Sequence, residues 1–104
     1  MAYNTHDMKA QLIRHDKNVD ELGHTIELKM WRLTKPSADK PHGYKYSLVY
    51  VVAGKRMIGY DNAEGKGDHK HYGERELPYR FRSLGEVAQD FLNDVERYKR
   101  GEKL

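Results

Sequence analysis

Alternating apolar and polar residues predict that the first two thirds of the chain form an antiparallel sheet. From Tyr44 to Val52 every second residue is large and apolar, which is typical of a strand with one face on a core. Gly54 then offers a tight turn into the next strand. Residues 61–78, rich in charge, His and Gly, predict a loop. The expected strands span residues 10–15, 24–30, 44–52, 56–60 and 79–82.

The last part of the chain predicts one helix. Ser83 with Glu86 three residues later forms a capping box, and apolar residues from Leu84 to Tyr98 recur at spacings of three and four. Gly101 suits the position just after the helix end. Strands followed by a single helix indicate an α+β fold, in which an antiparallel sheet of about five strands is covered on one face by the C-terminal helix.

The length of 104 residues allows one domain with one core. We expect a single α+β domain over residues 8–100, preceded by a flexible N-terminal extension over residues 1–7 and followed by a tail over residues 101–104. No apolar stretch is long enough to cross a bilayer or to serve as a signal peptide. This favours a cytoplasmic protein that does not enter a membrane.

Charge and cysteine content narrow the chemistry. Nineteen Lys and Arg against sixteen Asp and Glu leave a net charge of +3, which permits a polyanionic partner such as RNA without requiring one. The absence of Cys excludes disulfides, thiolate nucleophiles and thiolate metal ligands. Histidines, carboxylates and hydroxyls are therefore the groups left for chemistry.

The segment that ends at His71 contains the strongest candidate chemistry. His69 and His71 are two residues apart, so in an extended chain both imidazoles point to the same side. Imidazoles exchange protons near neutral pH, and Asp68 or Asp61 could orient one of them. The cations that could neutralise a phosphate in the transition state are Lys66, Lys70 and Arg80.

Other interpretations of these residues stay open. A charged, glycine-broken stretch between strands is most often a solvated hairpin loop. A metal site could use His69, His71 and either aspartate, although the His-X-His spacing does not define a geometry. The tyrosines of residues 44–52 could stack RNA bases, but packing against a covering helix is favoured. The remaining histidines, expected on the surface, are His6, His15, His24 and His42.

Several motifs resemble the TumE family of toxins from toxin–antitoxin systems. They are Gly59-Tyr-Asp-Asn62, Gly65-Lys-Gly-Asp-His-Lys-His71, Glu76-Leu-Pro-Tyr-Arg-Phe81, Asp90-Phe91, Trp31-Arg-Leu33 and Tyr44-Lys-Tyr-Ser-Leu48. The likeness covers roughly residues 8–95, and the block that ends at His71 is far more specific than a lone Gly-X-Gly. Family members often begin near the position of Met8 and commonly have Arg at the position of Lys70.

The resemblance implies a small toxin that acts as a ribonuclease and is neutralised by an antitoxin with a helix-turn-helix domain. Together with the histidine pattern it predicts an endoribonuclease that cleaves RNA, free or on the ribosome, by metal-independent acid–base catalysis without a cofactor. The catalytic candidates are His69, His71, Asp68 and Lys66. The substrate-binding candidates are Lys70, Arg80, Tyr60, Asp61 and Asn62.

Two alternative functions accompany this prediction. In the first, the protein is a non-catalytic module that binds RNA, the ribosome or a protein partner through charge. In the second, it is a metal-dependent nuclease. An exposed sheet edge could also serve a homodimer.

Overall fold

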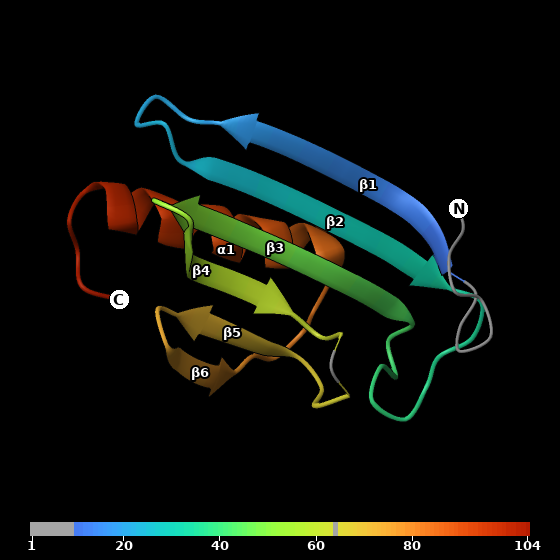
Figure 1. Cartoon of the computed structure of the whole chain (residues 1–104). Helices are drawn as coiled ribbons and strands as arrows, with labels where there is room; N and C mark the ends of the chain where they lie inside the picture. The colour runs from blue at the N-terminus through green and yellow to red at the C-terminus, as the bar shows by residue number, and fades with distance from the viewer. Residues whose placement is uncertain (1–9, 64) are drawn as a thin grey trace.

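The computed structural model describes residues 10–63 and 65–104, which form an antiparallel sheet and one helix (Figure 1). The six strands lie in the sheet in chain order, so β1 and β6 are its two edges. The predicted α+β fold is confirmed, with six strands where about five were expected. The strands are β1 (Ala10–Val19), β2 (Thr25–Leu33), β3 (Tyr44–Val52), β4 (Lys55–Asp61), β5 (His69–Tyr72) and β6 (Arg75–Pro78).

The helix α1 (Leu84–Lys99) begins at the predicted cap, where the Ser83 hydroxyl accepts the backbone N–H of Glu86 at 3.1 Å. It lies behind the sheet in Figure 1 and packs on β3 and β4. Tyr46 and Tyr50 of β3 are fully buried in the core that the helix covers. They are therefore packing residues, and their rings are not available to stack RNA bases. The helix residues of this core are Val87, Ala88, Phe91 and Val95.

The segment predicted as a loop contains the hairpin of β5 and β6, and the strand predicted over residues 79–82 is wrong. Strand β6 ends at Pro78, and residues 79–82 lead as irregular chain into the helix. A two-residue turn joins the hairpin, with Gly73 at a φ of 62°. The hairpin was hard to predict because the buried residues of β5 are the imidazoles of His69 and His71, so the usual aliphatic alternation of a strand is missing.

The two ends of the chain differ in what the structure describes. The predicted flexible extension over residues 1–7 lies outside the described residues. At the other end Leu104 packs against the core, and Glu102 pairs with Arg97 and Arg100. No helix in the described part of the chain has the length and apolar character needed to cross a membrane.

Candidate functional site

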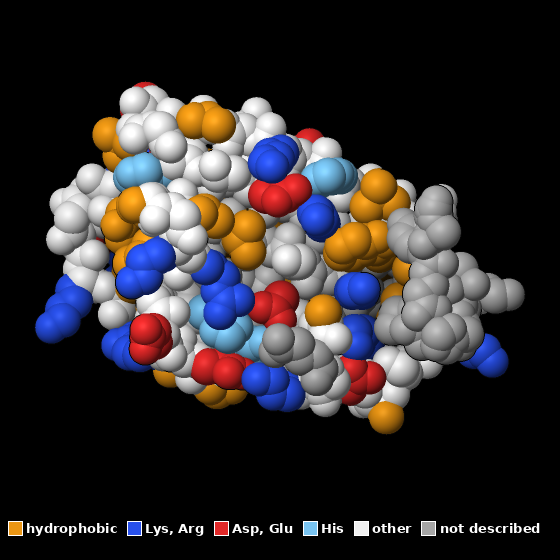
Figure 2. Space-filling view, viewed as in Figure 1, with side chains coloured by type: hydrophobic (Ala, Val, Ile, Leu, Met, Phe, Trp, Pro, Cys, Tyr) orange, Lys and Arg blue, Asp and Glu red, His pale blue; other side chains and the backbone are white. Residues whose placement is uncertain are grey.

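Sheet register brings Asp61, His69 and His71 together. Asp61 of β4 pairs with His69 of β5, and Gly59 pairs with His71, so all of these residues point to the same face. This is the open face of the sheet, opposite the helix (Figure 2). Figure 2 shows histidine, acidic and basic side chains gathered there over β4 and β5. The predicted pairing of His69 with His71 on one side of an extended segment is therefore what the structure shows.

The two imidazoles share one carboxylate. Their ring centres are 4.9 Å apart and the rings are nearly perpendicular, at 80°. Nε2 of His69 lies 3.0 Å from Oδ1 of Asp61, and Nε2 of His71 lies 3.4 Å from Oδ2. The residues are only 3% and 7% exposed, so both rings are held inside the surface.

The surroundings of the rings set their protonation. Nδ1 of His69 lies 3.0 Å from the carbonyl oxygen of Gly67, which can only accept, so Nδ1 carries a proton there. Burial lowers the pKa of His71, and the nearby Arg56 guanidinium lowers it further against the opposing effect of Asp61. His71 is therefore neutral at neutral pH.

Charged side chains that the sequence analysis did not assign surround this centre. Nη1 of Arg56 lies 4.0 Å from Oδ2 of Asp61, and a carboxylate oxygen of Glu76 lies 3.8 Å from Nε2 of His69. Lys66, a predicted catalytic residue, reaches the centre through Glu76, which it pairs with at 3.2 Å. Only Gly59 could have pointed to the position of the Arg56 side chain in the sequence, because a glycine inside a strand often marks the close approach of another group.

Asp68 and Asn62 belong to a separate cluster beside the first residues of β3. Asp68 accepts the Tyr46 hydroxyl at 2.7 Å and lies 3.0 Å from Nε2 of His42, whose ring stacks on Phe81. Asn62 is fully buried and lies 3.4 Å from the same carboxylate. The histidine that Asp68 contacts is thus His42, which was expected on the surface and is half-buried.

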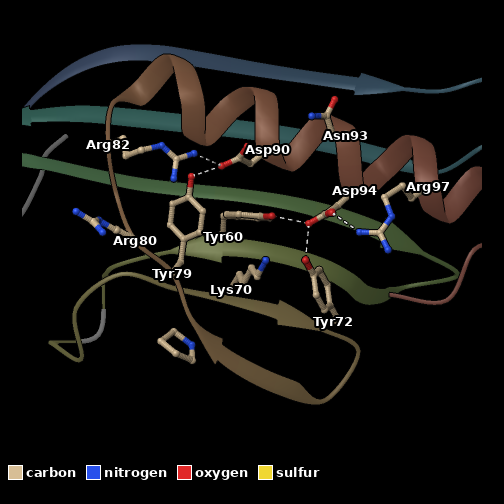
Figure 3. A pocket seen from close by; sticks show the side chains of 11 residues that line it. Tyr60, Lys70, Tyr72, Tyr79, Arg80, Arg82, Asp90, Asn93, Asp94 and Arg97 are labelled. Carbon is tan, nitrogen blue, oxygen red and sulfur yellow. Dashed lines mark hydrogen bonds and ion pairs between the residues drawn. The ribbon is translucent and has the colours of Figure 1, made fainter.

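Three predicted substrate-binding residues, Tyr60, Lys70 and Arg80, lie on the helix side of the sheet. Lys70 alternates with the two histidines along β5 and so points away from them. These three residues line a hollow of about 550 Å³ between β4, β5 and α1 (Figure 3). Nζ of Lys70 lies 5.0 Å from the ring centre of Tyr72, and neither Lys70 nor Arg80 forms an ion pair with a described residue.

The wall of this hollow is a network of phenols and carboxylates. Asp94 of α1 accepts the hydroxyls of Tyr60 at 2.5 Å and Tyr72 at 2.8 Å, and Asp90 accepts that of Tyr79 at 2.5 Å (Figure 3). Burial, with these carboxylates adding to it, raises the pKa of Tyr60 and of Tyr79. The phenols therefore stay protonated and donate hydrogen bonds to the carboxylates. Lys70 and Arg80, which form no ion pair with a described residue, are the groups of the hollow left to bind an anionic ligand.

One group of residues has the composition and spacing to hold a metal ion. One ligand atom from each of Asp61, His69 and His71 lies within 4.8 Å of the other two. Imidazole nitrogens and carboxylate oxygens are common ligands of divalent transition metals.

The fold and this centre define a small α+β protein with two imidazoles and a carboxylate on the open face of its sheet. The family comparison makes the assignment specific. The model of the family Toxin TumE matches residues 3–99, and the chain belongs to this toxin family. The match begins at residue 3, within the predicted extension. The chain matches no curated protein and no solved structure. Membership of a toxin family implies an antitoxin partner.

Proposed function

We propose that this toxin cleaves RNA and that Asp61, His69 and His71 form its reacting centre. The observation that carries the proposal is the convergence of two imidazoles on one carboxylate, with the Arg56 guanidinium beside them. Groups that transfer protons or bind a metal ion, next to a cation for a phosphate, are what phosphodiester cleavage needs. The predicted use of His69 and His71 as acid and base without a metal stays a prediction.

In this proposal RNA reaches the two imidazoles only when more exposed side chains beside them move. The side chains of Arg56 and Lys66 are 42% and 52% exposed, whereas the two imidazole side chains are at most 9% exposed. A phosphate that pairs with Arg56 would draw this long side chain outward and uncover His71. The proposed cleavage forms a bond from the ribose 2′-oxygen to phosphorus and breaks the bond from phosphorus to the 5′-oxygen. A base of the centre takes the 2′-hydroxyl proton and an acid returns one to the 5′-oxygen, so the products are a 2′,3′-cyclic phosphate and a 5′-hydroxyl.

Two partners are proposed. The substrate is single-stranded RNA, free or on the ribosome. Membership of the toxin family supports an antitoxin partner, and the helix-turn-helix domain proposed for it is what the family resemblance implies. Lys70 and Arg80 bind the RNA backbone on the helix side of the sheet, away from the reacting centre. Because β6 is a short edge strand, a flexible strand of RNA can pass around it between the two faces.

The test is cleavage of single-stranded RNA by the purified chain and by the variants Asp61→Asn and His71→Gln. We expect each variant to lose at least about 100-fold in cleavage rate, since positioned proton-transfer groups typically contribute that much. His15→Gln is the matched control, because His15 lies on β1 with its side chain 45% exposed. RNA in which the 2′-hydroxyl is replaced by hydrogen should resist cleavage.

Two results would end the proposal. Folded Asp61→Asn and His71→Gln proteins that cleave as fast as the unaltered chain would move the reaction elsewhere. RNA that is bound with a steep salt dependence but never broken would leave the non-catalytic binding module as the function.

A further inference from the structure

We infer that Asp61, His69 and His71 bind a divalent transition-metal ion. Each residue offers one ligand atom, and the three atoms lie within 4.8 Å of one another on adjacent strands. The Nε2 atoms of the two histidines lie 3.0 and 3.4 Å from the Asp61 carboxylate and are the nitrogens assigned to the ion. Two imidazoles and one carboxylate are a ligand set for ions such as Zn²⁺, Co²⁺, Ni²⁺ and Mn²⁺, whereas Mg²⁺ and Ca²⁺ prefer oxygen ligands. The His-X-His spacing left this interpretation open, and the contribution of Asp61 from the neighbouring strand supplies the third ligand.

The hydrogen bond of His69 prepares this residue as a ligand. Its Nδ1 lies 3.0 Å from the carbonyl oxygen of Gly67 and donates there, so Nε2, which faces Asp61, is the nitrogen left to bind an ion. A ligating imidazole almost always donates its other ring N–H to a carbonyl or carboxylate in this way. Gly67 itself has a φ of 80°, a conformation that favours glycine and that presents its carbonyl to the ring.

His71 gives an independent reason to expect an ion. Its side chain is 9% exposed and its Nε2 faces Asp61, yet this buried nitrogen forms no hydrogen bond with any described residue. Buried polar atoms are nearly always paired, and an exception asks for a ligand, water or ion. A metal ion between the two Nε2 atoms and the Asp61 carboxylate would satisfy it.

Three protein ligands give the ion a vacant position. Structural zinc sites usually have four protein ligands, whereas catalytic sites keep three and leave the fourth position to water or substrate. Glu76 is a further carboxylate beside the three ligands, with an oxygen 3.8 Å from Nε2 of His69. The use of that position for an RNA phosphate rests on the proposed function, but the binding of the ion does not.

The experiment is a titration of Zn²⁺ into the chelator-treated full chain, followed by calorimetry and by nitrogen NMR of the imidazole rings. We expect one ion per chain, with the Nε2 signals of two histidines shifted and those of the others unchanged. Asp61→Asn and His71→Gln should weaken the affinity by at least about 100-fold, because even residues that only support a metal ligand contribute 10- to 100-fold.

A matched variant separates this site from other histidines. His15→Gln removes an imidazole of β1 whose side chain is 45% exposed, and it should bind Zn²⁺ within twofold of the unaltered chain. The inference is overturned if no saturable binding occurs, or if His71→Gln binds as tightly as the unaltered chain. If a variant fails to fold, the imidazole signals of the unaltered chain test the inference instead. Zinc-induced shifts confined to histidines other than His69 and His71 would overturn the inference.

The two proposals can fail separately. Zinc binding is measured without RNA, so a chain that binds Zn²⁺ through these residues and never cleaves RNA retains the metal site and loses the nuclease. A chain that cleaves RNA fully in chelator and binds no ion retains the nuclease and loses the metal site.

Discussion

The side chain of Arg56 lies against Gly59, too close to leave ordinary room for a Cβ there. A Cβ built on Gly59 would lie 2.9 Å from Cδ of Arg56 and 3.5 Å from Cδ2 of His71. Glycine therefore leaves room for the Arg56 side chain over this position, with Nη1 of its guanidinium 4.0 Å from Asp61. This places the permanent positive charge of Arg56 beside the candidate metal ligands. We expect this charge to favour the binding of a phosphate and to oppose the binding of a cation.

Replacing Arg56 should tighten zinc binding. The variant Arg56→Gln removes a cation from beside Asp61, and two unit charges about 4 Å apart interact by about 1 kcal/mol even in water. We expect about a fivefold gain in Zn²⁺ affinity, since about 1.4 kcal/mol corresponds to a factor of ten. Lys55→Gln makes the same charge change one residue earlier and should alter the affinity by far less. Equal effects of the two variants in calorimetry would show that only net charge matters.

Gly59→Ala tests the same relationship through shape. The added methyl group meets the flexible Arg56 side chain, which can move at little cost, so the fold should persist. The displaced guanidinium should again allow tighter zinc binding. A Gly59→Ala protein that binds Zn²⁺ as the unaltered chain does, with a folded circular dichroism spectrum, would show that Arg56 does not influence the centre.

Asn62 should be one of the residues most important for stability. It is fully buried, its side-chain oxygen accepts the Tyr46 N–H at 3.1 Å, and its amide donates to the Tyr44 carbonyl at 2.8 Å. Asn62→Ala leaves both backbone groups buried and unpaired, and each such group costs about 1–3 kcal/mol. We expect a loss of roughly 2–4 kcal/mol in the free energy of unfolding by urea. Asn93→Ala, an exposed change on α1, should lose less than about 0.5 kcal/mol.

The acid stability of the fold should depend on Asp20. Burial opposes ionisation of this residue, but hydrogen bonds from the His24 and Leu22 N–H groups and the Tyr50 hydroxyl outweigh it and lower the pKa from 3.8 to about 2. The unfolded chain therefore takes up this proton first as the pH falls. The stabilisation is complete well above pH 3.8 and is lost as the pH falls toward 2.

The measurement is the difference in unfolding free energy between the unaltered chain and Asp20→Asn at several pH values. This difference should be constant above about pH 5 and should shrink as the pH falls below it. Asp16→Asn, which removes an exposed carboxylate on β1, is the control. A difference that stays constant down to pH 2 would contradict the assignment.

Local sequence patterns predicted the elements whose buried positions hold apolar residues or whose ends carry a capping motif. The alternation from Tyr44 to Val52 gave β3 its bounds because those side chains are large and apolar, and Ser83 with Glu86 gave the helix start. The hairpin of β5 and β6 was missed because His69 and His71 fill the buried positions of β5, where a strand is normally recognised by aliphatic residues.

The geometry of the candidate site could be predicted only where it is local, and its role stays a prediction. Spacing alone puts His69 and His71 on one face of a single strand. It did not select the aspartate beside them: Asp68 was the catalytic candidate, whereas the sheet register brings Asp61 to the two rings. Arg56 could not be found in this way, because its place beside Asp61 depends on a side chain lying across Gly59. The same period-two argument that pairs the histidines turns Lys70 to the opposite face, away from the proposed reacting centre.

Lys70 and Arg80 should contribute to RNA affinity through charge alone. Neither forms an ion pair with a described residue, and both line the hollow on the helix side, where phosphates can reach them. Each phosphate contact to a single strand lowers the slope of log affinity against log salt by about 0.7. We therefore expect Lys70→Gln and Arg80→Gln each to make that slope shallower by about 0.7, and the double variant by about 1.4. Lys17→Gln, the same charge change on β1, should leave the slope as it is, and a Lys17→Gln effect of equal size would place RNA on the open face near β1 instead.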